Sequence, residues 1–277
     1  MSTIINQLIR SNYAIFKKVM YRNRMNEKTG ISDAERQRIL LPENRENSKI
    51  TLFSRDFFFT SSTAFLHSVD EIFGEDIYKF STPNQKPYII DCGANMGLST
   101  IYFKRQHPDA EIDAFEPDAN IAEVLQKNVT PYNKNQDIRI HTKAVWSEET
   151  ILEFVPDGGL SGKIVTASEG VVTCKIPTVD LKKYLQRPVD FLKIDIEGAE
   201  NDLIFDLQGH LQQVRHLFLE YHGMINEKQN LGDILNLIKN EGFEYYIRVA
   251  GETLRFPFCG ELPKYFNQQL NIFCYRK

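Results

Sequence analysis

Three acidic residues stand where their carboxylates could meet one ligand. Asp91, Glu116 and Asp195 each end or directly follow a short run with the apolar, β-branched character of a buried strand. Ligands of open α/β sheets bind outside the carboxyl ends of the strands, so acids at three such ends indicate a common site. Carboxylates there can accept hydrogen bonds from hydroxyl groups, for example those of a ribose. A nucleotide-like ligand is therefore the first hypothesis.

The turn after the first of these runs, residues 91–97, has the composition of a ligand-binding turn. Gly93 and Gly97 flank it, and glycine lets backbone N–H groups and a helix N-terminus come close to a ligand. Asn95 stands between them, and asparagine tolerates a positive φ. The spacing G-x-x-x-G is not the G-x-G-x-x-G of dinucleotide-binding folds, which counts against NAD. Without further residues, a plain tight turn explains the two glycines equally well.

Glu116 strengthens the ligand-binding interpretation of the turn. It lies 19 residues after Gly97 and directly follows the run 111–115. An acid at that strand end can accept hydrogen bonds from both hydroxyl groups of a ribose.

A second group of residues could remove a proton from a substrate. Glu197, Glu220 and His222 follow or end the fourth and fifth apolar runs, close to Asp195. Histidine suits a general base because its ordinary pKa lies near neutrality. Asp195, Glu220 and His222 could instead bind a divalent ion together. The alternatives are a salt bridge or helix-cap contact for Glu220, and a loop histidine without a role for His222.

The elements that position these residues alternate between strands and helices. Strands separated by helices predict a mainly parallel sheet, and the last two strands, with no helix between them, should pair antiparallel. The predicted fold class is thus α/β, a Rossmann-like sheet of seven strands. The expected strands are 88–91, 111–115, 138–141, 191–195, 217–221, 243–249 and 270–275, and the expected helices are 97–106, 118–128, 199–214 and 231–240.

The first part of the chain has a different pattern and is predicted to form an extension, residues 1–85, before the main domain, residues 86–277. Residues 50–59 are β-like, and residues 62–80 have the apolar stripe of a helix. Residues 2–25 read as an amphipathic helix with five basic residues and no acid. Such a helix could lie on an anionic membrane surface, pack on its own domain, or join two copies as a homodimer.

Composition limits the class of protein. The net charge is −4, which gives no indication of nucleic-acid binding. The four cysteines form no C-x-x-C pair and are expected to be reduced and buried. With no signal peptide and no apolar run of about 18 residues, the sequence predicts a cytoplasmic protein.

Four segments resemble the FkbM family of S-adenosylmethionine (SAM)-dependent methyltransferases. They are Tyr88–Thr100, Ala114–Asp118, Lys143–Ser147 and Asp190–Glu200, and the resemblance covers roughly residues 57–250. It implies a SAM-binding Rossmann-like fold and O-methylation of sugar hydroxyls on glycans or of hydroxyls on secondary metabolites. By position, it implies SAM contacts at Asp91, Gly93, Asn95, Gly97, Ser99, Glu116, Ala144 and Asp195.

Within that resemblance, Glu116 would hold the ribose, Ala144 would lie against the adenine, and Asp195 would face the methionine end. Methyl transfer to an alcohol needs donor and acceptor in line, and a base or metal ion that removes the hydroxyl proton. Asp195, Glu197, Glu220 and His222 are the candidates for that step. The alternatives are an NAD(P)-dependent oxidoreductase on a similar fold and a non-catalytic SAM-binding assembly protein. The segment 157–162, rich in glycine, is either a lid over the acceptor or a surface loop.

Overall fold

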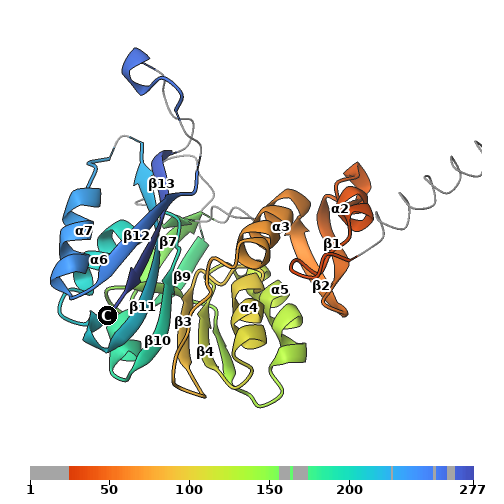
Figure 1. Ribbon diagram of the computed structural model, residues 1–277, viewed down its shortest axis with the longest axis horizontal. Coiled ribbons are helices and arrows are strands. Elements are labelled where there is room, and N and C mark those ends of the chain that lie inside the picture. Colours follow the sequence, from red (N-terminus) through yellow and green to blue (C-terminus); the bar gives the residue numbers. More distant parts are fainter. Residues whose placement is uncertain (1–24, 156–162, 165–173, 226, 252–253, 261–265) are drawn as a thin grey trace, which may run out of the picture. The chain divides into compact units, whose positions relative to one another are not determined.

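The computed structural model of the protein describes residues 25–155, 163–164, 174–225, 227–251, 254–260 and 266–277 (Figure 1). The chain forms two compact units, Met1–Ile77 and Tyr78–Lys277. The division expected from the sequence, between residues 85 and 86, stays a prediction. Residues 1–24, which hold most of the segment 2–25 that is predicted to be a basic amphipathic helix, lie outside the described residues, as does the segment 157–162, predicted to be either a lid or a surface loop. Among the described residues, no helix combines the length and apolar character that crossing a bilayer requires.

The first unit contains a β-hairpin where the sequence predicts one β-like stretch over 50–59. The turn at Phe53 and Ser54 has two consecutive residues with positive φ, 49° and 63°. Neither is a glycine, asparagine or aspartate, the residues that usually indicate such a turn, so no local pattern predicts it. The elements are α2 (Asp33–Ile39), β1 (Glu46–Leu52), β2 (Arg55–Ser61), α3 (Ser62–Val69) and a π-helical turn (Asp70–Gly74).

The helix predicted over 62–80 is shorter than expected. Ser61 caps its start, because its hydroxyl accepts the N–H of Ala64. The π-helical turn then ends the helical segment at Gly74, so the prediction for residues 75–80 was wrong.

The second unit is built on a seven-stranded sheet with the order β12-β13-β11-β10-β3-β4-β5. Strands β11, β10, β3, β4 and β5 pair parallel, and β13 pairs antiparallel with both β11 and β12. The predicted Rossmann-like class, with seven strands and a final antiparallel pair, is confirmed. The strands are β3 (Tyr88–Cys92), β4 (Glu111–Phe115), β5 (Ile138–His141), β10 (Val189–Ile194), β11 (Val214–Met224), β12 (Glu244–Val249) and β13 (Phe266–Tyr275).

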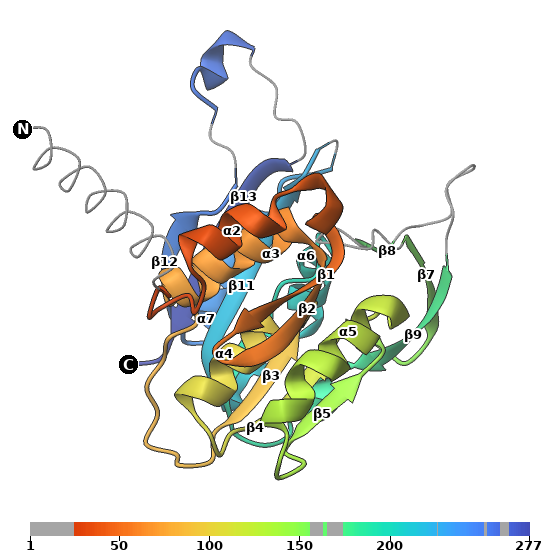
Figure 2. The ribbon, with the colours of Figure 1, turned by 90° about the vertical axis from the view of Figure 1, so that its right-hand side faces the viewer.

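Helices cover both faces of this sheet. Helices α4 (Leu98–Gln106) and α5 (Ala119–Val129) lie on one face, and α6 (Glu200–Asp206) and α7 (Leu231–Asn240) lie on the other (Figure 1). Figure 2 shows β3, β4 and β5 side by side behind α4 and α5. These helices bury apolar side chains on the sheet, and strand β3 is buried along its whole length.

The helix predicted over 199–214 ends much earlier. Helix α6 stops at Asp206, and Gly209 then adopts φ +79°, which a right-handed helix cannot contain. A short 3₁₀ turn, Leu211–Gln213, leads into β11 at Val214. The apolar residues of this connection pack in the core without helical geometry.

The chain segment between β5 and β10 forms a second, smaller sheet with the order β6-β9-β7-β8. Its strands are β6 (Ala144–Trp146), β7 (Ile151–Val155), β8 (Lys163–Ile164) and β9 (Cys174–Asp180). The cysteines are unpaired, and Cys92 and Cys274 are buried as predicted. Cys174 and Cys259 are exposed, so the prediction of four buried thiols was wrong for these two.

Candidate active site at the carboxyl ends of the strands

The turn after β3 is held by hydrogen bonds from the backbone. The N–H groups of Gly93 and Ala94 both donate to the carbonyl of Phe115, at 3.0 and 2.9 Å. Gly93 has φ +80°, and a Cβ built on it would lie 1.8 Å from the carbonyl oxygen of Asp195. Glycine is therefore required here both by backbone conformation and by the close approach of the strand β10 segment.

The remainder of the turn has the geometry expected from its composition. Asn95 adopts φ +47°, and its side-chain oxygen accepts the N–H of Met96 at 2.7 Å. Gly97 has φ +94° and precedes α4 directly. A Cβ on Gly97 would meet the Leu125 side chain at 2.8 Å, so this glycine lets the turn pack on α5.

Glu116 connects the turn to the end of β4. Its two carboxylate oxygens accept backbone N–H groups from Asn95 and Asp118, each at 3.0 Å. The side chain is buried, and burial raises the pKa of Glu116 to about 7, although the two N–H donors act in the opposite direction. The acid predicted to hold a ribose thus lies against the glycine turn and is poised between its two charge states near neutral pH.

Asp91 and Ser99, both predicted at the ligand, contact each other in the interior. Asp91 is fully buried, and its Oδ2 accepts the hydroxyls of Ser99 and Thr100 at 2.6 and 2.8 Å. This contact ties the end of β3 to the first turn of α4. Ala144, predicted against an adenine, is buried in β6 of the smaller sheet.

Lys193, which the sequence reasoning did not select, connects the turn to the next group of acids. It is buried in β10, and its ammonium lies 3.0 Å from Asp195 Oδ2 and 3.7 Å from Asp91 Oδ1. It also donates to the carbonyl of Gly93 at 2.9 Å. Burial acts to lower the pKa of Lys193, but the carboxylates of Asp195 and Asp91 outweigh it and raise the pKa. A lysine inside an apolar strand was the available signal.

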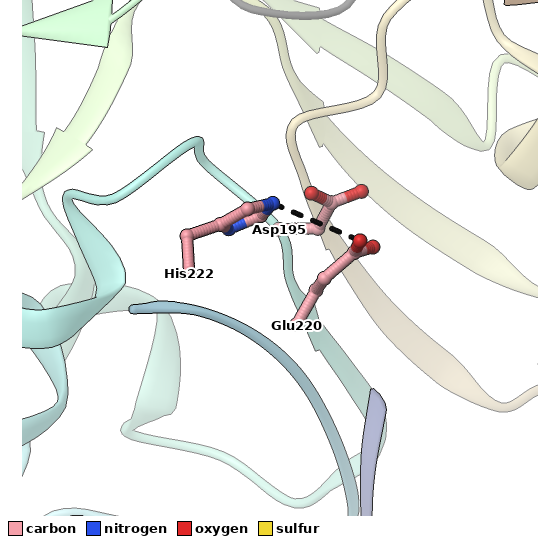
Figure 3. Close-up of side chains that lie close together, drawn as sticks. All are labelled: Asp195, Glu220 and His222. Atoms are coloured by element: carbon pink, nitrogen blue, oxygen red, sulfur yellow. Dashed lines mark ion pairs between the residues drawn. The ribbon is translucent and has the colours of Figure 1, made fainter. Parts of the chain in front are cut away.

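Asp195, the acid that pairs with Lys193, also comes together with Glu220 and His222. Asp195 follows the last residue of β10, and the other two lie on β11 with one residue between them, so their side chains share one face of the sheet. One ligand atom from each lies within 4.8 Å of those of the other two (Figure 3). The His222 Nε2 is 3.7 Å from Glu220 Oε1. The structure therefore brings together three residues of which the outermost, Asp195 and His222, are 27 positions apart in sequence.

His222 is oriented by Glu200, a residue that the sequence analysis did not connect with it. Both side chains are fully buried, and His222 Nδ1 lies 2.7 Å from Glu200 Oε1. The same oxygen accepts the backbone N–H of His222 at 2.9 Å. Burial acts to lower the pKa of His222, but the charge and hydrogen bond of Glu200, with Glu197 and Glu220, raise it to about 10.

Two further side chains, Glu197 and Gln269, complete a wall around His222 that also contains Asp195, Glu200 and Glu220. Glu197 adopts φ +57°, and its Oε2 lies 3.6 Å from His222 Nε2; burial raises the pKa of Glu197 to about 8. Gln269, from β13, donates from Nε2 to Glu220 Oε1 at 2.6 Å and lies 3.4 Å from His222 Nε2. Nothing in the sequence indicated Gln269, because only strand pairing places it opposite His222.

Comparisons with known proteins agree with this architecture. Residues 91–245 match the methyltransferase FkbM domain. Methyltransferase 1 of Beauveria bassiana (strain ARSEF 2860) is 25% identical over 205 residues, which cover 65% of this chain and 80% of that protein. The 2-O-methyltransferase NoeI of Sinorhizobium fredii (strain NBRC 101917 / NGR234) is 24% identical over 156 residues, or 49% of this chain and 63% of that protein.

Among solved structures, a methyltransferase FkbM from Methylobacillus flagellatus KT aligns with a TM-score of 0.46 and 16% identity, covering 76% of this chain and 53% of that one. The family match alone spans more than half of the present sequence and contains the glycine turn, Glu116 and the wall of acids around His222. The chain belongs to the FkbM methyltransferase domain family.

Proposed function

We propose that the protein transfers the methyl group of SAM to a hydroxyl group, on a sugar of a glycan or on a secondary metabolite. The observation that carries the proposal is the placement of the glycine turn and Glu116 beside a wall of carboxylates and a histidine at the same edge of the sheet. A relative that is named a 2-O-methyltransferase supports a hydroxyl acceptor.

The side chains at this edge of the sheet suit the chemical groups of SAM. SAM presents two ribose hydroxyls, an ammonium and a sulfonium, which are hydrogen-bond donors or cations, and the side chains at the edge are mostly carboxylates. Gly93, Asn95 and Gly97 would bring the backbone close to the nucleoside, and Glu116 would accept the ribose hydroxyls. The residues proposed to contact or shape the SAM site are Asp91, Gly93, Asn95, Gly97, Ser99, Glu116, Ala144 and Asp195.

The acceptor would approach from the side of Asp195, Glu197, Glu220 and His222. An alcohol must lose its proton as its oxygen attacks the methyl carbon, so groups that receive or displace a proton belong at this position. His222 is held in one orientation by Glu200, and both Glu197 and Glu220 face its Nε2. We propose that Asp195, Glu197, Glu220 and His222 carry the catalytic step. They act either directly or with a divalent ion held by Asp195, Glu220 and His222.

Calorimetric titration tests the cofactor first. SAM should bind one site per chain, and NAD should not, because the turn lacks the dinucleotide spacing. Binding of NAD without SAM would support the oxidoreductase alternative and reject our proposal.

A labelling screen then tests the acceptor. We expect the labelled methyl group of SAM to appear in glycan, lipid-linked saccharide or small-metabolite fractions. Label confined to protein or RNA would contradict the proposed acceptor class. SAM binding without turnover on any fraction, and without loss of the biological role in Asp195→Ala or His222→Ala, would favour a non-catalytic SAM-binding protein.

SAM affinity should depend on pH through Glu116. The pKa of Glu116 is about 7, and only the ionised carboxylate can accept both ribose hydroxyls. The ionised fraction rises from about one tenth at pH 6 to about nine tenths at pH 8, so SAM should bind roughly tenfold more tightly at pH 8. Calorimetric titrations at the two pH values measure this change.

Glu116→Gln is the matched control for this pH dependence. The amide keeps the shape of the side chain but cannot ionise, so the variant should bind SAM more weakly at pH 8 and lose the pH dependence due to Glu116. The amino group of SAM titrates in the same range, and it affects wild type and variant equally. An identical pH dependence in both proteins would remove Glu116 from the SAM site.

A further inference from the structure

The wall around His222 has the ligand set of a metal site. Asp195 and Glu220 offer carboxylate oxygens and His222 offers a ring nitrogen, with the three ligand atoms within 4.8 Å of one another (Figure 3). The side chain of Asp195 is 23% exposed and that of Glu220 12%, whereas His222 is fully buried, so Asp195 is the most exposed member of the group. Two hard oxygen ligands and one imidazole suit Mn²⁺ or Mg²⁺ and leave other coordination positions open.

The histidine is held in the orientation of a metal ligand. Its Nδ1 is bonded to the fully buried Glu200, and the backbone N–H of His222 fixes the same carboxylate oxygen. Glu200 Oε2 is fixed in turn by the N–H of Gly198 at 2.8 Å. A metal-binding histidine generally donates a hydrogen bond to a carboxylate from the N–H of the ring nitrogen that does not bind the ion. The other ring nitrogen then stays available to the ion. Here that nitrogen, Nε2, faces Glu220.

Gln269 adds a fourth side chain to the group. Its amide nitrogen lies 2.6 Å from Glu220 Oε1 and 3.4 Å from His222 Nε2, so it restrains Glu220 next to the imidazole. A half-turn of the amide group exchanges its nitrogen and oxygen, and a side-chain carbonyl is an accepted ligand of hard cations. Gln269 can therefore support the ligands in one orientation and contact a cation in the other.

The local charge also favours a bound cation. Four carboxylates lie at this position, two of them the proposed ligands Asp195 and Glu220, and among the described residues Lys193 pairs with Asp195. Lys193 also faces Asp91, so its single charge is divided between two acids. A divalent ion would offset the remaining negative charge more completely than solvent can at partly buried positions. The carboxylates are Asp195, Glu197, Glu200 and Glu220.

We infer that Asp195, Glu220 and His222 bind a divalent cation of the Mn²⁺ or Mg²⁺ class, which holds and acidifies the acceptor hydroxyl. This role rests on the proposed methyl transfer. The hydroxyl proton leaves to bulk water, and a new C–O bond forms while the C–S bond of SAM breaks. The electron pair of that C–S bond stays on sulfur, so S-adenosylhomocysteine is the second product. The cation acts as a Lewis acid and is unchanged at the end.

Manganese binding tests the site without reference to activity. The full chain, stripped with EDTA, is titrated with Mn²⁺, and the electron paramagnetic resonance signal of free Mn²⁺ reports the bound fraction. We expect one site per chain, with Mg²⁺ competing for it. Asp195→Asn, Glu220→Gln and His222→Ala should each weaken binding by at least about tenfold, and Glu200→Gln, which changes only the support of His222, by about tenfold.

Glu123→Gln is the matched control, because Glu123 is an exposed acid on α5 outside the group. It should bind Mn²⁺ as the wild type does. Circular dichroism shows that each variant is folded. Absence of Mn²⁺ binding at millimolar concentration, or equal binding by all the variants, would overturn the inference. Loss of turnover in His222→Ala with no Mn²⁺ binding in the wild type would also overturn it and give His222 a role in turnover that needs no metal ion.

The two proposals fail in different ways. If SAM binds and Mn²⁺ does not, the metal site is rejected and the proposed methyl transfer stands. If Mn²⁺ binds at these residues and SAM does not, the metal site stands and the proposed function is rejected.

Discussion

Gly93→Ala is expected to lower the free energy of unfolding by about 3 kcal/mol or more and to abolish SAM binding. A left-handed backbone costs a non-glycine residue about 1–2 kcal/mol, and the added Cβ would lie 1.8 Å from the Asp195 carbonyl oxygen. That oxygen belongs to the backbone, so no side-chain rotation relieves the overlap, and the turn and the end of β10 must move apart. Urea unfolding and calorimetric titration with SAM measure the two effects.

Gly209→Ala separates the backbone term from the steric one. Gly209 has φ +79°, almost that of Gly93, but a Cβ there meets nothing within 4 Å. This variant should lose only about 1 kcal/mol and bind SAM normally. Equal losses of stability in the two variants would show that the approach of Asp195 to Gly93 is looser than the structure indicates.

Lys193→Met is expected to cost about 3 kcal/mol of stability and to weaken SAM binding about tenfold. The substitution leaves Asp91 buried without its cation and removes the bond from the ammonium to the Gly93 carbonyl. Removing one partner of a buried ion pair is strongly destabilising, because the other charge remains in the interior. The ammonium of Lys193 holds the turn beside Asp195 through its hydrogen bond to the Gly93 carbonyl. Hydrogen bonds from charged groups contribute about 1.5–3 kcal/mol, so losing this one should lower the affinity for SAM.

Lys104→Met is the matched control for a buried lysine away from the site. Lys104 is also buried, pairs with Asp137 at 2.8 Å and donates to the carbonyl of Ala110. Its replacement should lower stability by at most about 3 kcal/mol and leave SAM affinity unchanged in the folded protein. If Lys193→Met also bound SAM as the wild type does, Lys193 would contribute to stability alone.

The main sheet could be predicted because its strands and helices carry regular apolar patterns. The helix over 231–240 and the strand over 111–115 have the predicted bounds, since a single repeated period determines each. The predicted bounds of strands and helices were wrong where tertiary packing decides the conformation. The turn at Phe53 lacks the usual turn residues. After Asp206, buried Leu207 and Leu211 keep a helical spacing, but the segment is not helical because Gly209 breaks the helix.

The candidate site was predictable to the extent that its residues lie at strand ends. Asp195, Glu220 and His222 do meet, because parallel neighbours bring their carboxyl ends to one edge. Lys193 and Gln269 were missed, and the contact of Glu200 with His222 was not predicted, for a different reason. Each acts through a contact with a residue on another element, and no spacing along the chain encodes those contacts.

The position of β13 determines the order in which this edge can be assembled. Strand β13 is the last in sequence of the seven, yet it lies between β11 and β12, which are both made before it. During synthesis, the edge of β11 that pairs with β13 therefore stays unpaired until β13 has been made. Glu220 and His222 meet Gln269 only when β13 docks. Detachment of β13 would expose the same edge again, so hydrogen exchange of the β11 amides that face β13 should follow the exchange of β13 itself. The group of Glu220, His222 and Gln269 is thus complete only when the last strand in sequence has docked.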